Sequence, residues 1–327
     1  MAKRPGEFEL IAELFAPLAA GYPGALDLKD DAAIVETPPG QCLVVTTDTI
    51  VAGVHFLPDD PAESVARKLL RVNLSDLAAK GARPTLYLLS LTMPESTEIG
   101  WLRDFAFGLA LDQREFDIAL AGGDTTSTPG PLTLTVTALG EIGHGKEIRR
   151  SGARTGDRVF VSGTLGEAAL GLKSLRGELA NLAPEHRTAL VARYRVPQPR
   201  VSLGQSLVGL ATACCDVSDG LVADLGHICE TSRVAAEIAV DRIPLSPATR
   251  AALAIDPDLI KLVATGGDDY ELVFTAPASQ AGEVVGRARD LGVAVAEIGQ
   301  CVPGAGVALL DPQGRPLTLS GAGWRHF

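Results

Sequence analysis

The chain of 327 residues has a mass of 34.0 kDa, and at about 100–200 residues per domain this length predicts two domains. A hydrophobic fraction of 46% and a charged fraction of 21% indicate a packed globular protein and exclude a disordered one. The 29 basic and 40 acidic side chains give a net charge of −11, which argues against a nucleic-acid or anionic-membrane binder because both need excess positive charge.

The apolar pattern predicts a first set of alternating helices and strands. In chain order these are a helix at 7–19, a strand at 42–46, a helix at 61–80, a strand at 85–92, a helix at 97–113 and strands at 117–122 and 132–140. Apolar residues and threonines alternate in the last strand, so they point to opposite faces of a sheet. No apolar run approaches the roughly 20 residues that cross a bilayer.

A glycine-rich, charged stretch at 143–157 marks the predicted boundary between domains at 1–148 and 149–327. The elements predicted beyond it are a strand at 158–162, helices at 165–176, 185–194 and 200–211, a strand at 213–217, a helix at 220–231 and strands at 235–240, 270–275, 293–298 and 306–310. The five cysteines never take a C-x-x-C spacing, which indicates reduced thiols in a soluble cytoplasmic protein.

Aspartates gather where the predicted strands end. The acids at such turns are Asp30, Asp31, Asp48, Asp124, Asp216, Asp219, Asp268 and Asp269. Active sites are often assembled at strand ends, but a single aspartate at a turn is equally explained by hydrogen bonds to nearby backbone amides. Asp76 favours a site, because it lies in line with Leu69 and Val72 on the buried stripe of its helix. An unpaired carboxylate is costly there, so a cation is expected.

Hard oxygen donors accompany these acids, including the hydroxyls of Thr46, Thr47 and Ser218 and the amide of Asn73. Such donors suit Mg²⁺ or Mn²⁺, with Ca²⁺ as an alternative, and the dispersed histidines argue against zinc. Because Mg²⁺ usually binds through one or two carboxylates together with substrate phosphates, the sequence predicts a polyphosphate ligand.

Common phosphate-binding signatures are absent from the sequence, including G-x-x-x-x-G-K-[ST] and the protein-kinase motifs. The best glycine loop is Gly122–Thr126, whose small residues permit close backbone approach while Asp124 holds a metal on the same phosphates. Gly163–Gly166 is either a second phosphate loop or a plain strand-to-helix turn. Arg149 and Arg150 are the nearest cations, and an exposed basic turn explains them equally well.

Eight segments occur in the order found in thiamine-monophosphate kinases. They are Asp30–Ala33, Thr46–Thr49, Gly53–Phe56, Asn73–Ala79, Gly122–Thr126, Asp216–Leu221, Gly266–Leu272 and the ending Gly323–Phe327. Each is weak alone, but together they span the chain, which therefore resembles this family of the aminoimidazole ribonucleotide synthetase-like superfamily. The resemblance implies an α/β (α+β) fold of two domains, with the N-terminal strands of two subunits pairing into a dimer-interface barrel.

The resemblance also implies that ATP phosphorylates thiamine phosphate to thiamine diphosphate with the help of several Mg²⁺ ions. Residues 1–148 would bind metal and ATP, and 149–327 would complete the ATP and substrate site. The implied Mg²⁺ ligands are Asp31, Thr46, Thr47, Asp48, Asp76, Asp124, Asp216 and Asp219. The implied ATP contacts are Gly123, Asp124, Arg150 and Ser218, the implied thiamine phosphate contacts are His55, Asp268 and Trp324, and the implied catalytic residues are Asp48, Asp76, Asp124 and Arg150.

The sequence departs from the family pattern at three positions, since Lys29 replaces a glycine, Thr46 a serine and Asp268 a glutamate. Two other functions stay open at this point. One is a related ATP-dependent enzyme that activates an amide or carbamoyl oxygen, and the other is a non-catalytic nucleotide-binding regulator. From the residues alone, His55 is also explained as a partly buried structural histidine and Trp324 as a terminal packing residue.

Overall fold

The structure is a computed structural model that describes residues 6–318 and 323. The chain forms two compact units. The N-terminal unit comprises Met1–Leu77 and Arg83–His144, and the C-terminal unit comprises Ala78–Ala82 and Gly145–Phe327. We expected the second domain to begin at residue 149, whereas the second compact unit begins at Gly145 and also includes the short segment at the end of the long helix.

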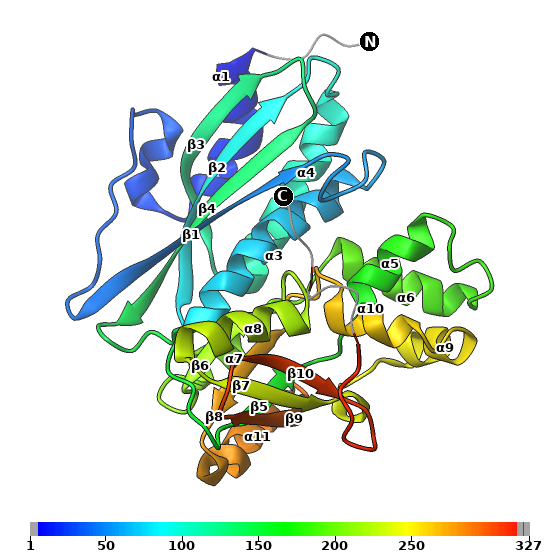
Figure 1. Cartoon of the computed structure of the whole chain (residues 1–327). Coiled ribbons are helices and arrows are strands. Elements are labelled where there is room, and N and C mark those ends of the chain that lie inside the picture. The colour runs from blue at the N-terminus through cyan, green and yellow to red at the C-terminus, as the bar shows by residue number, and fades with distance from the viewer. Residues whose placement is uncertain (1–5, 319–322, 324–327) are drawn as a thin grey trace. The chain divides into compact units, whose positions relative to one another are not determined.

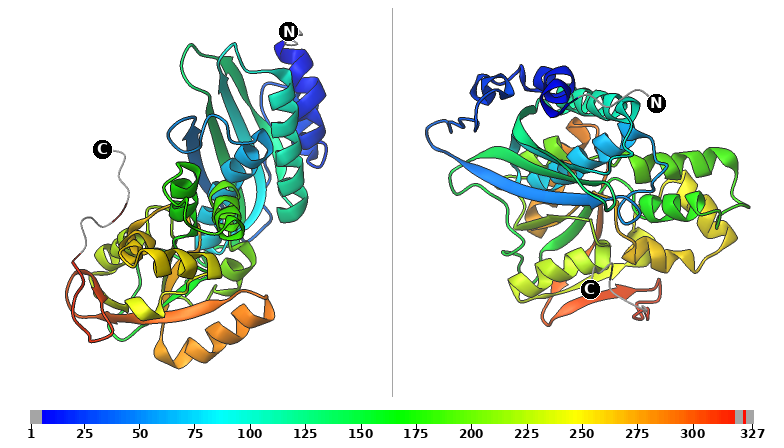
Figure 2. Two further views of the ribbon diagram at one scale, coloured as in Figure 1. Left: turned by 90° about the vertical axis from the view of Figure 1, so that its right-hand side faces the viewer. Right: turned by 90° about the horizontal axis from the view of Figure 1, so that it is seen from above.

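A four-stranded sheet forms the N-terminal unit, in the order β1 (Gln41–Val51), β4 (Thr133–Gly143), β2 (Arg83–Met93) and β3 (Ala119–Ser127). Strands β2 and β3 are parallel, and helix α4 (Ile99–Phe116) connects them. Helix α3 (Ala62–Lys80) packs beside α4 on the sheet (Figure 1). The N-terminal helical segment, α1 (Glu7–Leu10), η1 (Ile11–Phe15) and α2 (Ala16–Ala19), lies along α4 (Figure 2), and η2 (Pro23–Leu28) follows.

A buried ion pair joins α3 to α4. Arg71 and Asp112 are both fully buried, with Nε to Oδ2 at 2.7 Å and Nη2 to Oδ1 at 2.8 Å. Arg67 adds a third bond to Asp112, and Glu115 accepts from Arg71 at the exposed end. Two parallel charge-assisted bonds fix orientation as well as distance, so the two helices are held in register on the sheet.

The two faces of the N-terminal sheet differ, as the alternation in β4 predicts. Leu134, Val136 and Ala138 are buried, whereas the threonines between them are partly exposed. On the threonine face, Val45 and Leu88 are exposed by 59% and 38%. The predicted pairing of this sheet into a dimer barrel stays a prediction.

A six-stranded sheet forms the C-terminal unit. Its order is β10 (Gly306–Leu310), β7 (Ala235–Ala239), β9 (Val295–Val302), β5 (Arg158–Ser162), β8 (Leu272–Ala276) and β6 (Ala213–Asp216). Helix α8 (Leu221–Ser232) covers one face and α11 (Ala281–Asp290) the other (Figure 1). Along β5, Val159 and Val161 enter the core beneath α8, whereas Phe160 stacks on Phe274 with ring centroids 5.4 Å apart.

The remaining helices flank this sheet. They are α5 (Glu167–Leu175), α6 (Pro184–Arg195), α7 (Val201–Ser206), η3 (Val240–Arg242), α9 (Pro247–Ile255), α10 (Leu259–Thr265) and η4 (Ala278–Gln280). The sequence-based prediction missed α9, α10 and α11 and extended α7 to residue 211, beyond Gly209, which has a φ of 81°. Within the described residues, every helix is too short or too polar to cross a bilayer.

Candidate active site

Strand β1 and helix α3 bring two of the predicted acids together. The Thr46 hydroxyl donates to Asp76 Oδ2 at 2.5 Å, and the Asp48 N–H donates to Asn73 Oδ1 at 3.1 Å. Asn73 in turn donates to the Leu69 carbonyl at 3.0 Å. Thr46 and Asp48 lie two residues apart on β1 and therefore point to the same face of the sheet. Strand β1 is thus bonded to helix α3 through Thr46 and Asp48, which are two of the predicted metal ligands.

The surroundings of Asp48 disfavour its charged form. Burial, followed by the negative charge of Asp76, raises the pKa of Asp48 to about 6. A divalent cation would lower that pKa again, and carboxylate and hydroxyl oxygens are the donors that Mg²⁺ prefers. The residue types therefore fit Mg²⁺. Among residues 6–318 and 323, no group of three or more His, Cys, Asp or Glu side chains is placed to hold a metal, so the full ligand set stays a prediction.

Two other predicted residues of the N-terminal unit, Asp31 and Thr47, make no hydrogen bond to Asp48 or Asp76 among those of the described residues. Asp31 is exposed in the segment before β1, and its N–H donates to Asp30 Oδ1 at 2.8 Å. Thr47 points away from Thr46, and its hydroxyl donates to the Val136 carbonyl at 3.1 Å. Within the described chain, Asp31 does not complete a three-acid group with Asp48 and Asp76.

The predicted glycine loop forms the exposed half of β3. Gly123 aligns with Leu89 of β2, and a Cβ on Gly123 would lie 1.8 Å from the Leu89 carbonyl oxygen. Only glycine fits such an approach. The next residue, Asp124, is exposed and pairs with Ser90 of β2. Close packing against β2 therefore explains the glycine at position 123, while Gly123 and Asp124 are exposed to solvent at the place where the sequence predicted phosphate contacts.

His55 is partly buried at the turn after β1. Its Nδ1 accepts the Val51 N–H at 3.1 Å, which places the proton of the neutral ring on Nε2. Lys68, itself buried, donates to the His55 carbonyl at 3.0 Å. The first bond holds the ring by Nδ1, and the second holds the backbone of His55. Both interpretations of His55, as a substrate contact and as a structural histidine, agree with this placement.

In the C-terminal unit, the turn after β6 carries three predicted residues. Asp216 is buried at the strand end, and Ser218 and Asp219 are half-buried. The Asp219 and Gly220 N–H groups both donate to Asp224 Oδ2 at 3.0 Å. Burial raises the pKa of Asp224 to about 7, against the lowering effect of its backbone bonds and of Arg150. Arg150 thus lies within electrostatic reach of this turn.

A second turn, Gly266–Tyr270, lies against the first. The Asp268 N–H donates to the Ser218 carbonyl and the Tyr270 N–H to the Val217 carbonyl, both at 2.8 Å. Asp268 and Tyr270 have φ values of 72° and 51°, a region that costs a non-glycine residue about 1–3 kcal/mol and often marks functional sites. The structure therefore joins the predicted ATP and substrate turns. The predicted Trp324 lies outside the described residues.

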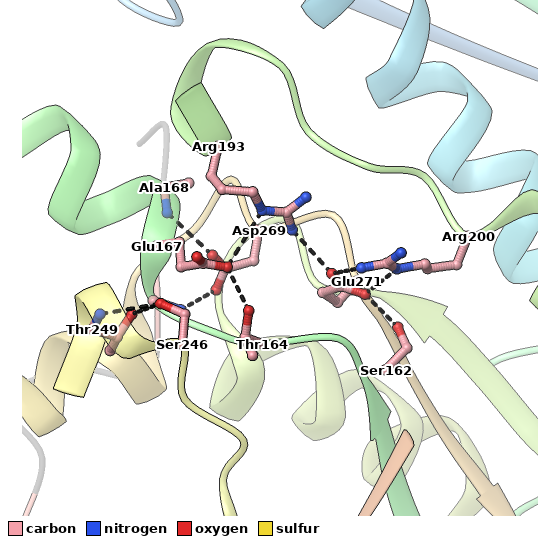
Figure 3. Close-up of polar contacts among 11 residues, drawn as sticks. Ser162, Thr164, Glu167, Ala168, Arg193, Arg200, Ser246, Thr249, Asp269 and Glu271 are labelled. Atoms are coloured by element: carbon pink, nitrogen blue, oxygen red, sulfur yellow. Dashed lines mark hydrogen bonds and ion pairs between the residues drawn. The ribbon is translucent and has the colours of Figure 1, made fainter. Parts of the chain in front are cut away.

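A buried cluster of charges supports the second turn, and it was not predicted from the sequence (Figure 3). Glu271 is fully buried and accepts from Arg200 Nε at 2.6 Å, Arg200 Nη2 at 2.5 Å, Arg193 at 2.9 Å and the Ser162 hydroxyl at 2.6 Å. Burial alone would lower the pKa of Arg200, but its hydrogen bond to Glu271 raises it above the ordinary value. A Cβ at Gly163 would lie 2.1 Å from Glu271 Oε1, so only glycine fits at position 163.

The neighbouring acid, Asp269, is also buried and accepts backbone N–H groups. Its Oδ2 accepts the Gly166 N–H at 2.7 Å and its Oδ1 the Ala168 N–H at 3.3 Å. Burial raises the pKa of Asp269 to about 7, although these backbone bonds and Arg193 act in the opposite direction. The motif containing Asp269 and Glu271 was visible in the sequence, but Arg193 and Arg200 lie 78 and 71 residues from Glu271 and carry no local signal of their partnership.

The chain matches two family models, "AIR synthase related protein, N-terminal domain" over residues 29–142 and "AIR synthase related protein, C-terminal domain" over 154–311. It is 45% identical to a thiamine-monophosphate kinase of Caulobacter vibrioides, covering 99% of this chain and 92% of the relative. A crystal structure of thiamine-monophosphate kinase from Stenotrophomonas maltophilia is 43% identical with a TM-score of 0.81, covering 89% and 91% of the two chains. A structure described as AaThiL complexed with AMPPCP and TMP is 33% identical with a TM-score of 0.78, covering 98% and 97%.

The raised pKa of Asp48 predicts a pH-dependent stability difference in metal-free protein. An acid whose pKa is raised on folding stays protonated in the folded state, so stability falls as pH rises through the window between 3.8 and about 6. Asp48→Asn should therefore gain stability relative to the wild type between about pH 4 and pH 7. At about 1.4 kcal/mol per pKa unit, the gain is at most about 3 kcal/mol.

Urea unfolding in the presence of a chelator measures this gain. Asp224 and Asp269 are common to both proteins, so their contributions cancel in the difference. Asp104→Asn, on the exposed side of α4, is the matched control and should show no gain. A wild type and an Asp48→Asn variant with parallel pH profiles would contradict the electrostatic account of the acid pair.

Proposed function

The chain belongs to the thiamine-monophosphate kinase family of the AIR synthase related proteins, and from this premise we propose that it transfers the γ-phosphoryl group of ATP to thiamine phosphate. The products are ADP and thiamine diphosphate. The observation that carries this function is the 45% identity over 99% of the chain to a thiamine-monophosphate kinase. A structural relative holds both AMPPCP and TMP. AMPPCP is an ATP analogue, and we interpret TMP as thiamine monophosphate, the phosphate acceptor.

The acceptor chemistry explains why the site contains few bases. The attacking group is a phosphate oxygen that is already anionic at pH 7, so proton abstraction is unnecessary. The protein must instead align two highly negative groups in line and offset their repulsion, which are tasks of positioning and electrostatics. A site rich in aspartates and turns, with one arginine, meets these requirements only if cations accompany the nucleotide.

Mg²⁺ completes this proposal. Bound Mg²⁺ supplies the positive charge that neutralises the transferring phosphoryl group. The residues proposed to hold the ions are Asp31, Thr46, Thr47, Asp48, Asp76, Asp124, Asp216 and Asp219. Support comes from the Asp48–Asp76 pair, because burial and then the charge of Asp76 raise the pKa of Asp48. The chain's own contribution is to hold Thr46 and Asp48 on β1 beside Asp76 on α3 before the nucleotide arrives.

The remaining residues are proposed to bind the two substrates. Gly123 and Asp124 on β3 and Ser218 on the turn after β6 contact ATP, with Arg150 as the cationic side chain. His55, Asp268 and Trp324 contact thiamine phosphate. The solvent exposure of Gly123 and Asp124 and the left-handed conformation of Asp268 support these assignments.

Assembly and location follow the family as proposals. A homodimer that pairs the threonine faces of two N-terminal sheets would cover Val45 and Leu88, which are exposed in the single chain. The five cysteines are all free, in keeping with a reducing, cytoplasmic compartment.

A product assay tests the function directly. Purified protein is incubated with ATP, Mg²⁺ and thiamine phosphate, and thiamine diphosphate and ADP are separated by chromatography. We expect the two products in equal amounts, and neither when thiamine phosphate is omitted. ADP without thiamine diphosphate would contradict the proposal and favour a relative that activates an amide or carbamoyl oxygen. Folded protein that binds ATP without consuming it would favour a regulator.

Asp76→Asn should abolish turnover while the fold remains intact. The amide keeps the shape and one acceptor oxygen for the Thr46 hydroxyl, but it removes the negative charge that a Mg²⁺ ligand provides. Steady-state rates at ordinary and high Mg²⁺ are the measurement, with circular dichroism to confirm folding. Asp104→Asn on α4 is the matched control and should retain its rate. Near-normal turnover of Asp76→Asn at ordinary Mg²⁺ would exclude Asp76 as a metal ligand.

A further inference from the structure

The turn Gly266–Tyr270 has an uncommon backbone. Asp268 and Tyr270 both take left-handed conformations, with φ of 72° and 51°, and Asp269 lies between them. Left-handed non-glycine residues persist where the surrounding structure holds them in place, and such residues cluster at ligand-binding positions. Asp268 is the proposed contact with thiamine phosphate, so the groups that hold its backbone control where its carboxylate lies.

The Asp269 side chain attaches this turn to the start of α5. It is 2% exposed, and each of its oxygens accepts one backbone N–H at the start of α5, from Gly166 at 2.7 Å and from Ala168 at 3.3 Å (Figure 3). A carboxylate that accepts backbone N–H groups at a helix start is favoured by both the hydrogen bonds and the helix dipole. Its partners lie 103 and 101 residues away in the sequence, so the attachment is tertiary rather than local.

The chain leaves this turn at a second fixed point. Glu271 begins the approach to β8 and is bonded by Arg193, Arg200 and Ser162. Asp268 and Tyr270 are thus next in sequence to two bonded carboxylates. That of Asp269 is bonded to backbone N–H groups, and that of Glu271 to arginines. Rotation of the Asp268 backbone is restricted from the C-terminal side by these two buried acids.

The neighbouring turn, with Ser218 and Asp219, has an anchor of its own. Asp224 is 1% exposed, and its Oδ2 accepts the N–H groups of Asp219 and Gly220. The two turns meet through backbone bonds, including that from the Asp268 N–H to the Ser218 carbonyl. Each turn therefore has a separate buried aspartate, Asp224 on the proposed ATP side and Asp269 on the proposed thiamine phosphate side.

We propose that Asp269 is a positioning residue for thiamine phosphate, acting through Asp268, and that Asp224 is its counterpart for ATP, acting through Ser218. The inference rests on the proposed function. Without the Asp269 carboxylate, the start of α5 no longer holds the turn, and Asp268 leaves the conformation in which it meets the substrate. Ser218 and Asp219 keep their conformation because Asp224 still caps their turn.

The test is a reciprocal pair of variants, Asp269→Ala and Asp224→Ala, with kcat and KM measured for both substrates. Asp269→Ala should raise the KM for thiamine phosphate by about tenfold or more, the scale of losing a charge-assisted hydrogen bond, while the KM for ATP changes by less than about twofold. Asp224→Ala should give the reverse pattern. In each variant the unaffected substrate reports that the protein is folded.

Asp269→Asn provides the milder variant if the alanine does not fold. It keeps one acceptor oxygen and replaces the other with a donor, so the KM for thiamine phosphate should rise by an intermediate amount. Equal changes in both KM values, or a lower kcat with both KM values unchanged, would overturn the inference. A wild type that makes no thiamine diphosphate would instead overturn the proposed function, and the inference with it.

Discussion

The electrostatic interaction between Asp48 and Asp76 is the physical constraint on which the proposed metal site of the N-terminal unit depends. Burial of Asp48, followed by repulsion from the Asp76 carboxylate, raises the pKa of Asp48. The reaction presents the same problem on a larger scale, since ATP and thiamine phosphate are both strongly negative. Cations that accompany the nucleotide would relieve both repulsions at once, which is the reason for the acids in the proposed site.

The C-terminal unit treats its buried charges differently, because there the charges are already paired within the chain. Glu271 is bonded to two arginines, and Asp269 and Asp224 accept backbone N–H groups. Paired in this way, the charges fix geometry rather than attract a ligand. The unit therefore presents two turns whose backbones are bonded to each other, one for each proposed substrate.

Much of this could be predicted from local sequence. The strand at 158–162 and the buried stripe of α3 follow from apolar periodicity alone. That stripe places Asp76 on the inner side of α3, but its bond to Thr46 of β1 is known only from the structure. The pairing of Glu271 with Arg193 and Arg200 could not be predicted, because it joins residues that meet only after the sheet and α6 have formed. Helices α9 and α10, of nine and seven residues, were missed, although α5 and α7 of similar length were predicted; short helices depend on tertiary packing more than on their own pattern.

Proton release on metal binding tests the central claim most directly. By isothermal titration calorimetry, an ATP analogue saturated with Mg²⁺ is titrated into the protein at about pH 6. The dependence of the heat on the ionisation enthalpy of the buffer gives the number of protons released. Because the pKa of Asp48 is about 6, the wild type should release about half a proton more than Asp48→Asn as metal displaces the proton. Equal proton release by the two proteins would show that the nucleotide's metal does not meet this acid pair, and would contradict the proposed role of Asp48 and Asp76.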